Sequence, residues 1–528
     1  MEIHVISENQ KHILSELTII SKSGIYDGLL RPIAYAISFL TSIVLARTVG
    51  ASAIGAIGVG LSIMMISQIL PGLGLNLTVL RKGGYYLGAN DANNVSRLIK
   101  LSCISVLVIS TSIVFSYFII LRKIAYPLLV RSVGSINVFD DLILVFPLIS
   151  LIPILQSSFT VIQKNYKITI FDQIIRNISR LVITIVFLFF FNHIIALLLG
   201  TIAGLILSSC ALAIILTKEL KKLNERLPVP VEEEHGIEMG DLLRYSAPLT
   251  IVPFLTTASR ELDLWVVGYM SSSREAGVYA IVRILGSVIL IPLIVFGELF
   301  AVSIAKFIRQ KNKDGVDKVF SISAKWIGLI SGIGFVIIFC LSEDMLRIFG
   351  PDFAIGSYAL KIFAFAQLYQ TIFGASGTIL LMYDKRKLLI INGILMLTLN
   401  LGLSIYMTSL WGMIGAAISV AVTYVIIQSI VLGEVVWLLK VKPGSIRDYA
   451  KRLLIMFITG ATIMFLSLVL RHALLLIKLG LSILLGIVVY FIATFLLEKW
   501  TQEEKTLLAN IAANTKSRLF GKLQKALE

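Results

Sequence analysis

The residues best placed to do chemistry are three charged side chains, Arg260, Glu261 and Asp263, which interrupt an apolar run from Ala247 to Met270. The run is long enough to cross a bilayer. An ionisable side chain at the centre of a membrane costs at least about 2.5 kcal/mol, so such residues normally face a partner or a water-filled cavity. The run therefore predicts a membrane helix that lines a polar cavity, and the rest of the chain must enclose that cavity.

Carboxylates inside the membrane helices of transporters often bind Na⁺ or H⁺. On this ground Asp263, Glu261 and Glu298 are candidates for coupling to a cation, and the sequence does not distinguish the two ions. Two alternatives stay open. Asp263 lies three residues after Arg260 on the same helical face and could neutralise it. Glu298 could serve as the partner of a basic neighbour.

The composition excludes a large soluble protein. Hydrophobic residues make up 57% of the 528 residues and charged residues 15%, which leaves too little polar surface. Apolar runs of about 18 or more residues recur along the whole length, so we predict an all-α polytopic membrane protein.

The net charge of +16 lies mostly in the connections between spans, and no nucleic-acid partner is predicted. The three cysteines lie far apart within apolar runs, so neither a metal site nor a cofactor is predicted.

The apolar runs predict about fourteen transmembrane helices, arranged as two lobes of about six helices each and two additional helices. A polar connection that contains Pro228, Pro230 and the acidic residues 232–234 separates the lobes. The predicted segments are a cytoplasmic arm (1–24), an N-lobe with spans 1 to 6 (25–217), a cytoplasmic linker (218–244), a C-lobe with spans 7 to 12 (245–438), the additional spans (439–497) and a basic amphipathic tail (498–528).

The distribution of basic residues predicts the orientation of the chain in the membrane. Most of the 47 lysines and arginines fall in the connections on one side of the predicted spans. Cytoplasmic loops carry an excess of Lys and Arg. An even number of spans places both termini on that same side, so both termini are predicted to be cytoplasmic.

A weak internal repeat relates the two lobes. When the chain is shifted so that Gly55 falls on Gly277, residues 52–58 align with 274–280 at the start of the second span of each lobe. A similar shift aligns residues 161–167 with 381–387, where the fourth span of each lobe ends. An even number of spans per lobe makes the repeat parallel, related by a pseudo-two-fold axis along the membrane normal. Two such lobes enclose a central cavity that can open alternately to either side.

Several loose motifs occur in a fixed order along these spans. They are Ile43–Gly50, Ile54–Gly55, Leu262–Gly268, Ala276–Val282, Gly374–Lys387, Asn400 and Trp411–Ser419. On these residues, and over nearly its whole length, the chain resembles the polysaccharide and O-antigen flippases of the multidrug/oligosaccharidyl-lipid/polysaccharide exporter superfamily.

The resemblance implies a flippase in the cell (cytoplasmic) membrane. Such a protein moves a polyprenyl-pyrophosphate-linked oligosaccharide from the cytoplasmic to the outer leaflet by alternating access, coupled to Na⁺ or H⁺. Its partners are the lipid-linked oligosaccharide, the lipid bilayer, and polysaccharide polymerases or transferases.

Within that role, four basic residues in or beside the predicted spans are candidate ligands of the pyrophosphate: Arg31, Arg260, Arg283 and Lys361. Arginine binds phosphate oxygens through two parallel hydrogen bonds, and a low-dielectric cavity strengthens the attraction. Arg31 and Lys361 lie near helix ends and could instead extend to the membrane interface. The aromatic residues nearest the predicted cavity are Phe254, Tyr279 and Tyr369, which could stack on sugars or simply pack in the helix bundle.

Other transport and enzyme classes remain as alternatives. A lipid II flippase of the same superfamily also has fourteen spans. A cation-coupled multidrug antiporter would need more membrane carboxylates and fewer cations than this chain has. A membrane glycosyltransferase or polymerase usually carries catalytic residues on a large outer loop, whereas the longest outer loop here is about 122–140, and no metalloprotease or nucleotide-binding motif occurs. We therefore predict that the chain is not an enzyme.

Overall fold

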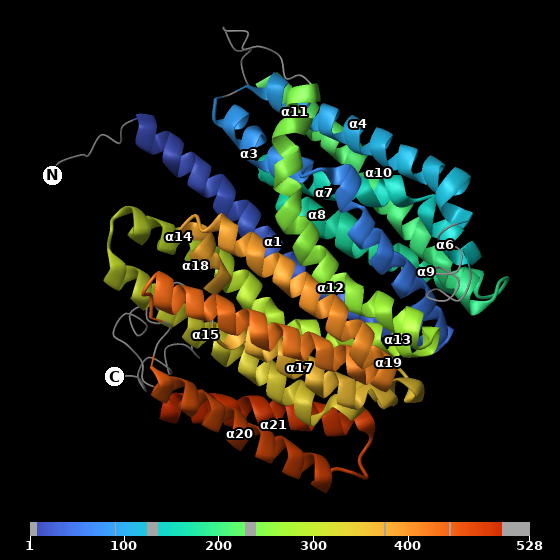
Figure 1. Cartoon of the computed structure of the whole chain (residues 1–528), viewed down its shortest axis with the longest axis vertical. Helices are drawn as coiled ribbons and strands as arrows, with labels where there is room; N and C mark the ends of the chain where they lie inside the picture. Colours follow the sequence, from blue (N-terminus) through green and yellow to red (C-terminus); the bar gives the residue numbers. More distant parts are fainter. Residues whose placement is uncertain are drawn as a thin grey trace.

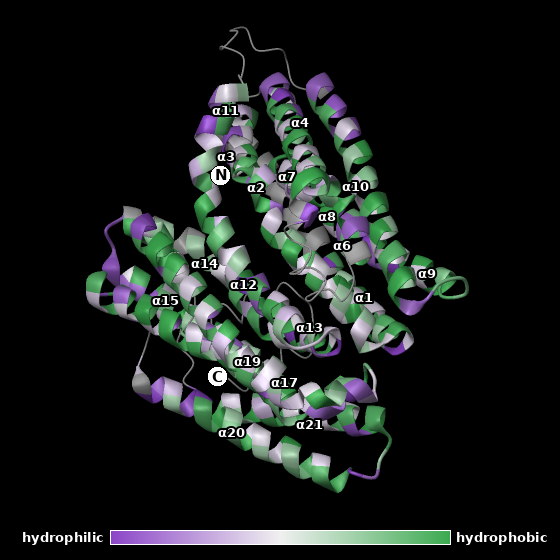
Figure 2. Cartoon of the chain, turned by 45° about the vertical axis from the view of Figure 1, so that its right-hand side comes forward, coloured by the Kyte–Doolittle hydropathy of each residue, from purple (hydrophilic) through white to green (hydrophobic). Residues whose placement is uncertain are grey.

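The computed structural model describes residues 8–89, 91–123, 136–226, 239–373, 376–442 and 445–498, and within these ranges every regular element is a helix (Figure 1). Nine of the described helices are long and apolar enough to cross a membrane. Hydrophobic residues cover the middle of the long helices, and hydrophilic residues gather at helix ends such as those of α10 and α11 (Figure 2). The prediction of an all-α polytopic membrane protein is confirmed.

Two of the nine helices are each two helices joined at a sharp change of backbone direction. In α1 (Glu8–Ser67) the break is at Gly50, whose φ of 79° suits glycine because it has no Cβ. In α19 (Arg386–Gly433) the break is at Trp411 and Gly412, and Gly412 has a φ of 55°. The predicted number of fourteen spans stays a prediction.

We call the first set of helices the N-lobe. It comprises α1, α2 (Ile69–Gly72), α3 (Leu75–Gly88), α4 (Ala92–Ser116), η1 (Tyr117–Leu121), α6 (Ile136–Ile143), α7 (Phe146–Val161), α8 (Asn165–Ile168), η2 (Thr169–Ile175), α9 (Arg176–Phe187) and α10 (His193–Arg226). The predicted arm 1–24 is part of α1 from Glu8 onward, and residues 1–7 lie outside the described ranges.

The second set is the C-lobe. It comprises η3 (Ala247–Thr250), α12 (Ile251–Met270), α13 (Ser273–Ser287), η4 (Val288–Leu290), α14 (Ile291–Arg309), α15 (Lys313–Cys340), α16 (Ser342–Arg347), η5 (Pro351–Gly356), α17 (Ser357–Ile372), α18 (Ser376–Met382), α19 and η6 (Glu434–Leu438). In Figure 1 the two lobes lie on opposite sides of the molecule, with α12 and α13 beside α1.

The predicted linker 218–244 is helical at both ends. Helix α10 continues to Arg226, and α11 (Met239–Ser246) begins after residues 227–238, which lie outside the described ranges. Helix α11 packs on the N-lobe: Leu242 is fully buried in a cluster with N-lobe residues, and the Ser105 hydroxyl donates a hydrogen bond to Sδ of Met239 at 2.7 Å. The chain therefore enters the C-lobe from a helix that is anchored on the N-lobe.

The lobes touch through two glycines. A Cβ on Gly55 would lie 1.7 Å from the carbonyl oxygen of Ser273, and a Cβ on Gly277 would lie 1.8 Å from the carbonyl oxygen of Ala51. The contact is reciprocal, as an interface on a two-fold axis requires. It joins the two residues that the sequence repeat aligns.

Helices α20 (Ile446–Val469) and α21 (Leu475–Leu497) lie side by side against the C-lobe, away from the N-lobe (Figure 1). A buried ion pair between Arg452 and Glu498 joins them, with Nε and Oε1 3.1 Å apart. The Tyr490 hydroxyl donates a hydrogen bond to the carbonyl of Leu329 in α15 at 2.7 Å. Of the predicted tail 498–528 only Glu498 falls within the described ranges.

Candidate functional site

The charged stretch of α12 is held against α13 by a tight helix hairpin. The two helices are joined only by Ser271 and Ser272, and the Ser272 hydroxyl accepts a hydrogen bond from the backbone N–H of Glu275 at 3.1 Å. Residues at similar distances from the turn face each other in such a hairpin. Asp263 and Tyr279 are two such residues.

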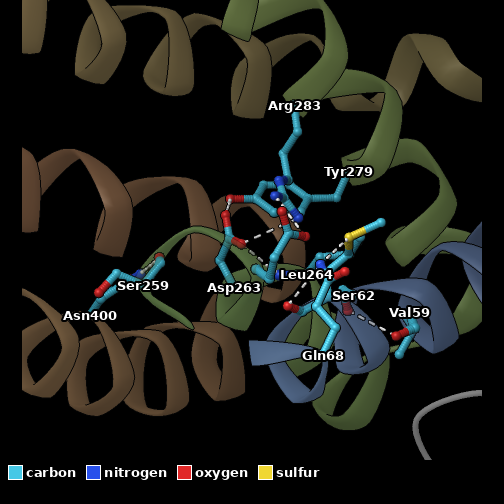
Figure 3. Close-up of polar contacts among 11 residues, drawn as sticks. Val59, Ser62, Gln68, Ser259, Asp263, Leu264, Tyr279, Arg283 and Asn400 are labelled. Atoms are coloured by element: carbon cyan, nitrogen blue, oxygen red, sulfur yellow. Dashed lines mark hydrogen bonds and ion pairs between the residues drawn. The ribbon is translucent and has the colours of Figure 1, made fainter. Parts of the chain in front are cut away.

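Asp263 is the centre of a network of polar contacts between the two helices (Figure 3). Its Oδ2 accepts a hydrogen bond from the Tyr279 hydroxyl at 2.9 Å, and its Oδ1 accepts one from the backbone N–H of Leu264 at 2.8 Å. Arg283 lies with Nη1 3.5 Å from Asp263 Oδ1 and with Nη2 3.1 Å from Glu261 Oε2. Asp263 is 2% exposed and Tyr279 is fully buried. We call Glu261, Asp263, Tyr279 and Arg283 the α12–α13 cluster.

The α12–α13 cluster has two carboxylates and one guanidinium, so its formal charge is negative when both carboxylates are ionised. Burial in a medium of low dielectric constant strengthens the attraction of such a group for a cation. Arg283 is already paired with two acids, which leaves it less able to bind a pyrophosphate. Among the described residues no group of three or more His, Cys, Asp or Glu residues could hold a metal ion.

Arg260 is placed differently from the cluster. Its side chain is exposed, and no described carboxylate lies within ion-pair distance of it. The alternative in which Asp263 neutralises Arg260 is therefore not the arrangement in this structure, where Asp263 pairs with Arg283. On α12, Arg260 is therefore the basic side chain that remains available to bind an anionic ligand.

The other sequence candidates lie elsewhere. Arg31 is exposed on α1. The ammonium of Lys361 lies over the ring of Tyr358, 5.4 Å from its centroid, and over that of Phe339 at 5.9 Å. The Tyr279 ring instead packs on Phe363, which is two residues from Lys361 and so on another face of α17. Glu298 belongs to α14, and its side chain lies outside the described part of the structure.

Among the predicted aromatic residues, Tyr369 and Phe254 have no contact with the cluster that the structure records. The Tyr369 hydroxyl bonds with that of Ser429 at 2.8 Å, and Phe254 is half-buried. Asn400 is one of the motif residues. It is fully buried, and its Nδ2 donates a hydrogen bond to the carbonyl oxygen of Ser259 at 2.7 Å (Figure 3). It therefore links α19 to α12 one turn from Asp263.

Two polar groups inside the N-lobe were missed by the sequence reasoning. Glu219 accepts hydrogen bonds from Lys164 and Lys167, which join the end of α7 and α8 to α10. Asp172 in η2 accepts a bond from Gln156 at 2.9 Å and pairs with Arg176 at 3.1 Å, four residues later. The i,i+4 spacing of Asp172 and Arg176 is the sequence signal for that pair.

A cavity of ≈ 140 Å³ lies between the lobes. Its walls come from the segment Gln68–Asn76, from α7, and from η3 with the first turns of α12. The lining residues are Gln68, Ile69, Gly72, Gly74, Asn76, Ser150, Pro153, Ile154, Thr250, Pro253 and Thr257. None of them is charged.

Comparisons with known proteins identify the family. Residues 20–299 match the family model described as Polysaccharide biosynthesis protein, and residues 248–406 match the model described as MatE. The first match covers more than half of the 528 residues. The chain belongs to the polysaccharide biosynthesis protein family. A comparison with curated protein sequences gave no match.

The fold of this polysaccharide biosynthesis family member is that of known transporters. A lipid II flippase MurJ in an inward closed conformation aligns over 89% of this chain and 98% of its own length, with a TM-score of 0.68 and 17% identity. An inward-facing multidrug resistance MATE family transporter of the MOP superfamily aligns over 75% of this chain and 92% of its own, with a TM-score of 0.59 and 12% identity. A MOP superfamily transporter from Pyrococcus furiosus, described as having a binding pocket of reverse polarity, has a TM-score of 0.54 and 14% identity over 78% of this chain and 94% of its own.

The polysaccharide family predicted from the sequence motifs is confirmed. The described part of the chain has several apolar helices long enough to cross a membrane, and its fold is shared with a flippase and with exporters of the superfamily that the motifs predict.

Proposed function

We propose that this family member is a flippase that moves a polyprenyl-pyrophosphate-linked oligosaccharide from the cytoplasmic to the outer leaflet of the cell membrane by alternating access. Both termini face the cytoplasm, and polysaccharide polymerases or transferases act on the same lipid. The observation that carries the proposal is the cavity between the lobes of a polysaccharide biosynthesis family member. Thr257, which lines that cavity, lies one helical turn from Arg260, a cation without an acidic partner among the described residues.

The contacts between the lobes support alternating access. With the termini in the cytoplasm, the contact of Gly55 with Gly277 lies on the outer side. So does the hydrogen bond from Nε of Arg47 to the carbonyl of Ile348 at 2.6 Å. These contacts hold the outer ends of the lobes together, and they must separate when the substrate leaves.

The α12–α13 cluster supports coupling to a cation. A proton or Na⁺ that enters the cluster neutralises one of its two carboxylates, and this weakens the hold of Asp263 and Glu261 on Arg283. Because α12 also forms a wall of the cavity, a change in this ion pair acts on the substrate site. Glu298 remains a candidate from the sequence alone.

A reconstitution experiment tests the proposal. The purified full chain in vesicles should move a fluorescent polyprenyl-pyrophosphate oligosaccharide between leaflets under a Na⁺ or proton gradient. Arg260→Ala should lower the rate by about 10- to 100-fold, because a charge-assisted hydrogen bond contributes about 1.5–3 kcal/mol. Arg274→Ala removes an exposed arginine that pairs with Asp352, and it should leave the rate unchanged. The proposal fails if the native chain moves no lipid under Na⁺, proton or potential gradients.

A lipid II flippase is the second candidate, favoured by the alignment over 89% of this chain, which has TM-score 0.68. The same vesicles loaded with lipid II decide between the two substrates. A cation-coupled multidrug antiporter is less well supported, because the residues that line the cavity include no carboxylate for a cationic drug.

A further inference from the structure

We propose that the uncharged cavity between the lobes binds a neutral sugar residue next to the pyrophosphate, and that it selects against glycans with a carboxylate on that sugar. The inference rests on the proposed flippase function, because the sugar reaches the cavity as part of the lipid-linked substrate. It adds the class of glycan that the site accepts.

The polar groups of the cavity are hydroxyls and amides only. They belong to Gln68, Asn76, Ser150, Thr250 and Thr257. The hydroxyl oxygens of Ser150 and Thr250 are buried and have no hydrogen-bond partner in the structure. A buried polar group without a partner costs about 1–3 kcal/mol. The two residues line the cavity, and a rotation of either side chain about χ1 turns its hydroxyl towards the cavity, where a sugar hydroxyl supplies the missing bond.

Sugar hydroxyls match this lining because each can donate and accept, as the side-chain hydroxyls and amides of the cavity can. A carboxylate does not match it, because an ionised group without a counter-charge is expensive to bury. The apolar walls contributed by Pro153, Pro253 and Ile154 suit the C–H faces of a sugar ring. The lining thus favours a neutral hexose over a hexuronic acid.

The position of the cavity agrees with the order of groups in the substrate. Thr257 lines the cavity, and Arg260 follows three residues later on the same side of α12. The two positions are about 4.5 Å apart along the helix axis. A pyrophosphate bound at Arg260 therefore places the sugar that is attached to it beside Thr257 and the uncharged cavity.

Gly72 gives a direct way to fill the cavity without disturbing its walls. It lines the cavity, and a Cβ built on it meets no heavy atom within 4 Å. Gly84 in α3 is a matched control, since a Cβ there also meets nothing within 4 Å and Gly84 does not line the cavity.

The first test compares two polyprenyl-pyrophosphate lipids in vesicles that contain the full chain, one with glucose and one with glucuronic acid as the first sugar. We expect the neutral lipid to move at least about tenfold faster, since burying an unpaired charge costs more than about 1.4 kcal/mol. Gly72→Leu should reduce transport of the neutral lipid by a similar factor, and Gly84→Leu should not. Equal rates for the two lipids, or native transport by Gly72→Leu, would overturn the inference.

The second test measures binding without transport. In a chain whose three cysteines are replaced by alanine, Gly72→Cys provides a thiol in the cavity for a maleimide. The neutral lipid should slow its labelling at least about tenfold and the uronic lipid should not; equal protection by both lipids contradicts the inference. If the neutral lipid protects Gly72→Cys while neither lipid is moved, the flippase function fails and the sugar site stands. If the lipids move and no protection is seen, the sugar site fails alone.

Discussion

Tyr279→Phe removes the hydroxyl that binds Asp263 and changes little else. The hydroxyl donates to Oδ2 of Asp263 at 2.9 Å, and the side chain is fully buried, so water does not replace the lost bond. The phenyl ring keeps its packing against Phe363. A hydrogen bond to a charged group contributes about 1.5–3 kcal/mol, whereas hydrogen bonds between membrane helices average about 0.6 kcal/mol. The acceptor is a carboxylate that pairs with one arginine only, so we treat it as charged and expect Tyr279→Phe to lower the free energy of unfolding by about 1.5–3 kcal/mol.

Tyr490→Phe is the matched control. Tyr490 is also buried, at 4% exposure, and donates to the neutral carbonyl of Leu329 at 2.7 Å. A bond between neutral groups contributes about 0.5–1.5 kcal/mol. Equilibrium unfolding of the purified chain in mixed micelles with increasing sodium dodecyl sulfate measures the free energy of unfolding of both variants.

A double-mutant cycle isolates the charge of the acceptor. In the Asp263→Asn background the acceptor is neutral, so Tyr279→Phe should cost only about 0.5–1.5 kcal/mol. The reasoning is refuted if Tyr279→Phe costs no more than Tyr490→Phe in the native chain, or if its cost is the same with Asp263 and with Asn at that position.

Three further predictions use the same unfolding measurement. Gly277→Ala should lower the free energy of unfolding by about 1–3 kcal/mol, because the added Cβ overlaps the N-lobe backbone, whereas Gly84→Ala should not lower it. Equal free energies of unfolding for the two variants would contradict the close contact. Arg452→Met should cost about 3–5 kcal/mol, and adding Glu498→Met should restore most of it; a double variant as unstable as the single one would show that the buried pair is not the cause. Gly50→Ala should lower the free energy of unfolding by about 1–2 kcal/mol, because a φ of 79° is unfavourable for alanine even though a Cβ there meets no heavy atom within 4 Å. An unchanged free energy of unfolding would mean that the break of α1 tolerates a side chain.

The sequence predicted the location of the candidate site better than its contacts. Three charges in one apolar run placed a polar site on α12, and Asp263 is indeed buried among helices. Spacing within a helix suggested Arg260 as its partner. The actual partners, Tyr279 and Arg283, come from the next helix, and their approach depends on the short turn at Ser271 and on how the two helices are rotated. The nearly equal distances of Asp263 and Tyr279 from that turn were the available signal.

The sequence also predicted only part of the fold. The repeat aligned Gly55 with Gly277, and these two residues touch each other, because a close backbone contact between two repeated positions requires a glycine at each of them. The polar composition around Leu242 suggested a linker, yet this short helix packs on the N-lobe through a single fully buried leucine. One buried apolar residue among polar neighbours gives too weak a hydrophobic periodicity to predict a helix.

The repeat has a consequence for how charge is shared between the lobes. The alignment that carries Gly55 onto Gly277 also carries Thr41 onto Asp263 and Leu61 onto Arg283. The backbone is duplicated, but the acid and the guanidinium occur in one copy only. A cation that reaches the α12–α13 cluster therefore meets charged groups in the C-lobe, whereas the matching positions of the N-lobe hold a hydroxyl and a hydrocarbon, so a repeated scaffold responds to the cation in one lobe only.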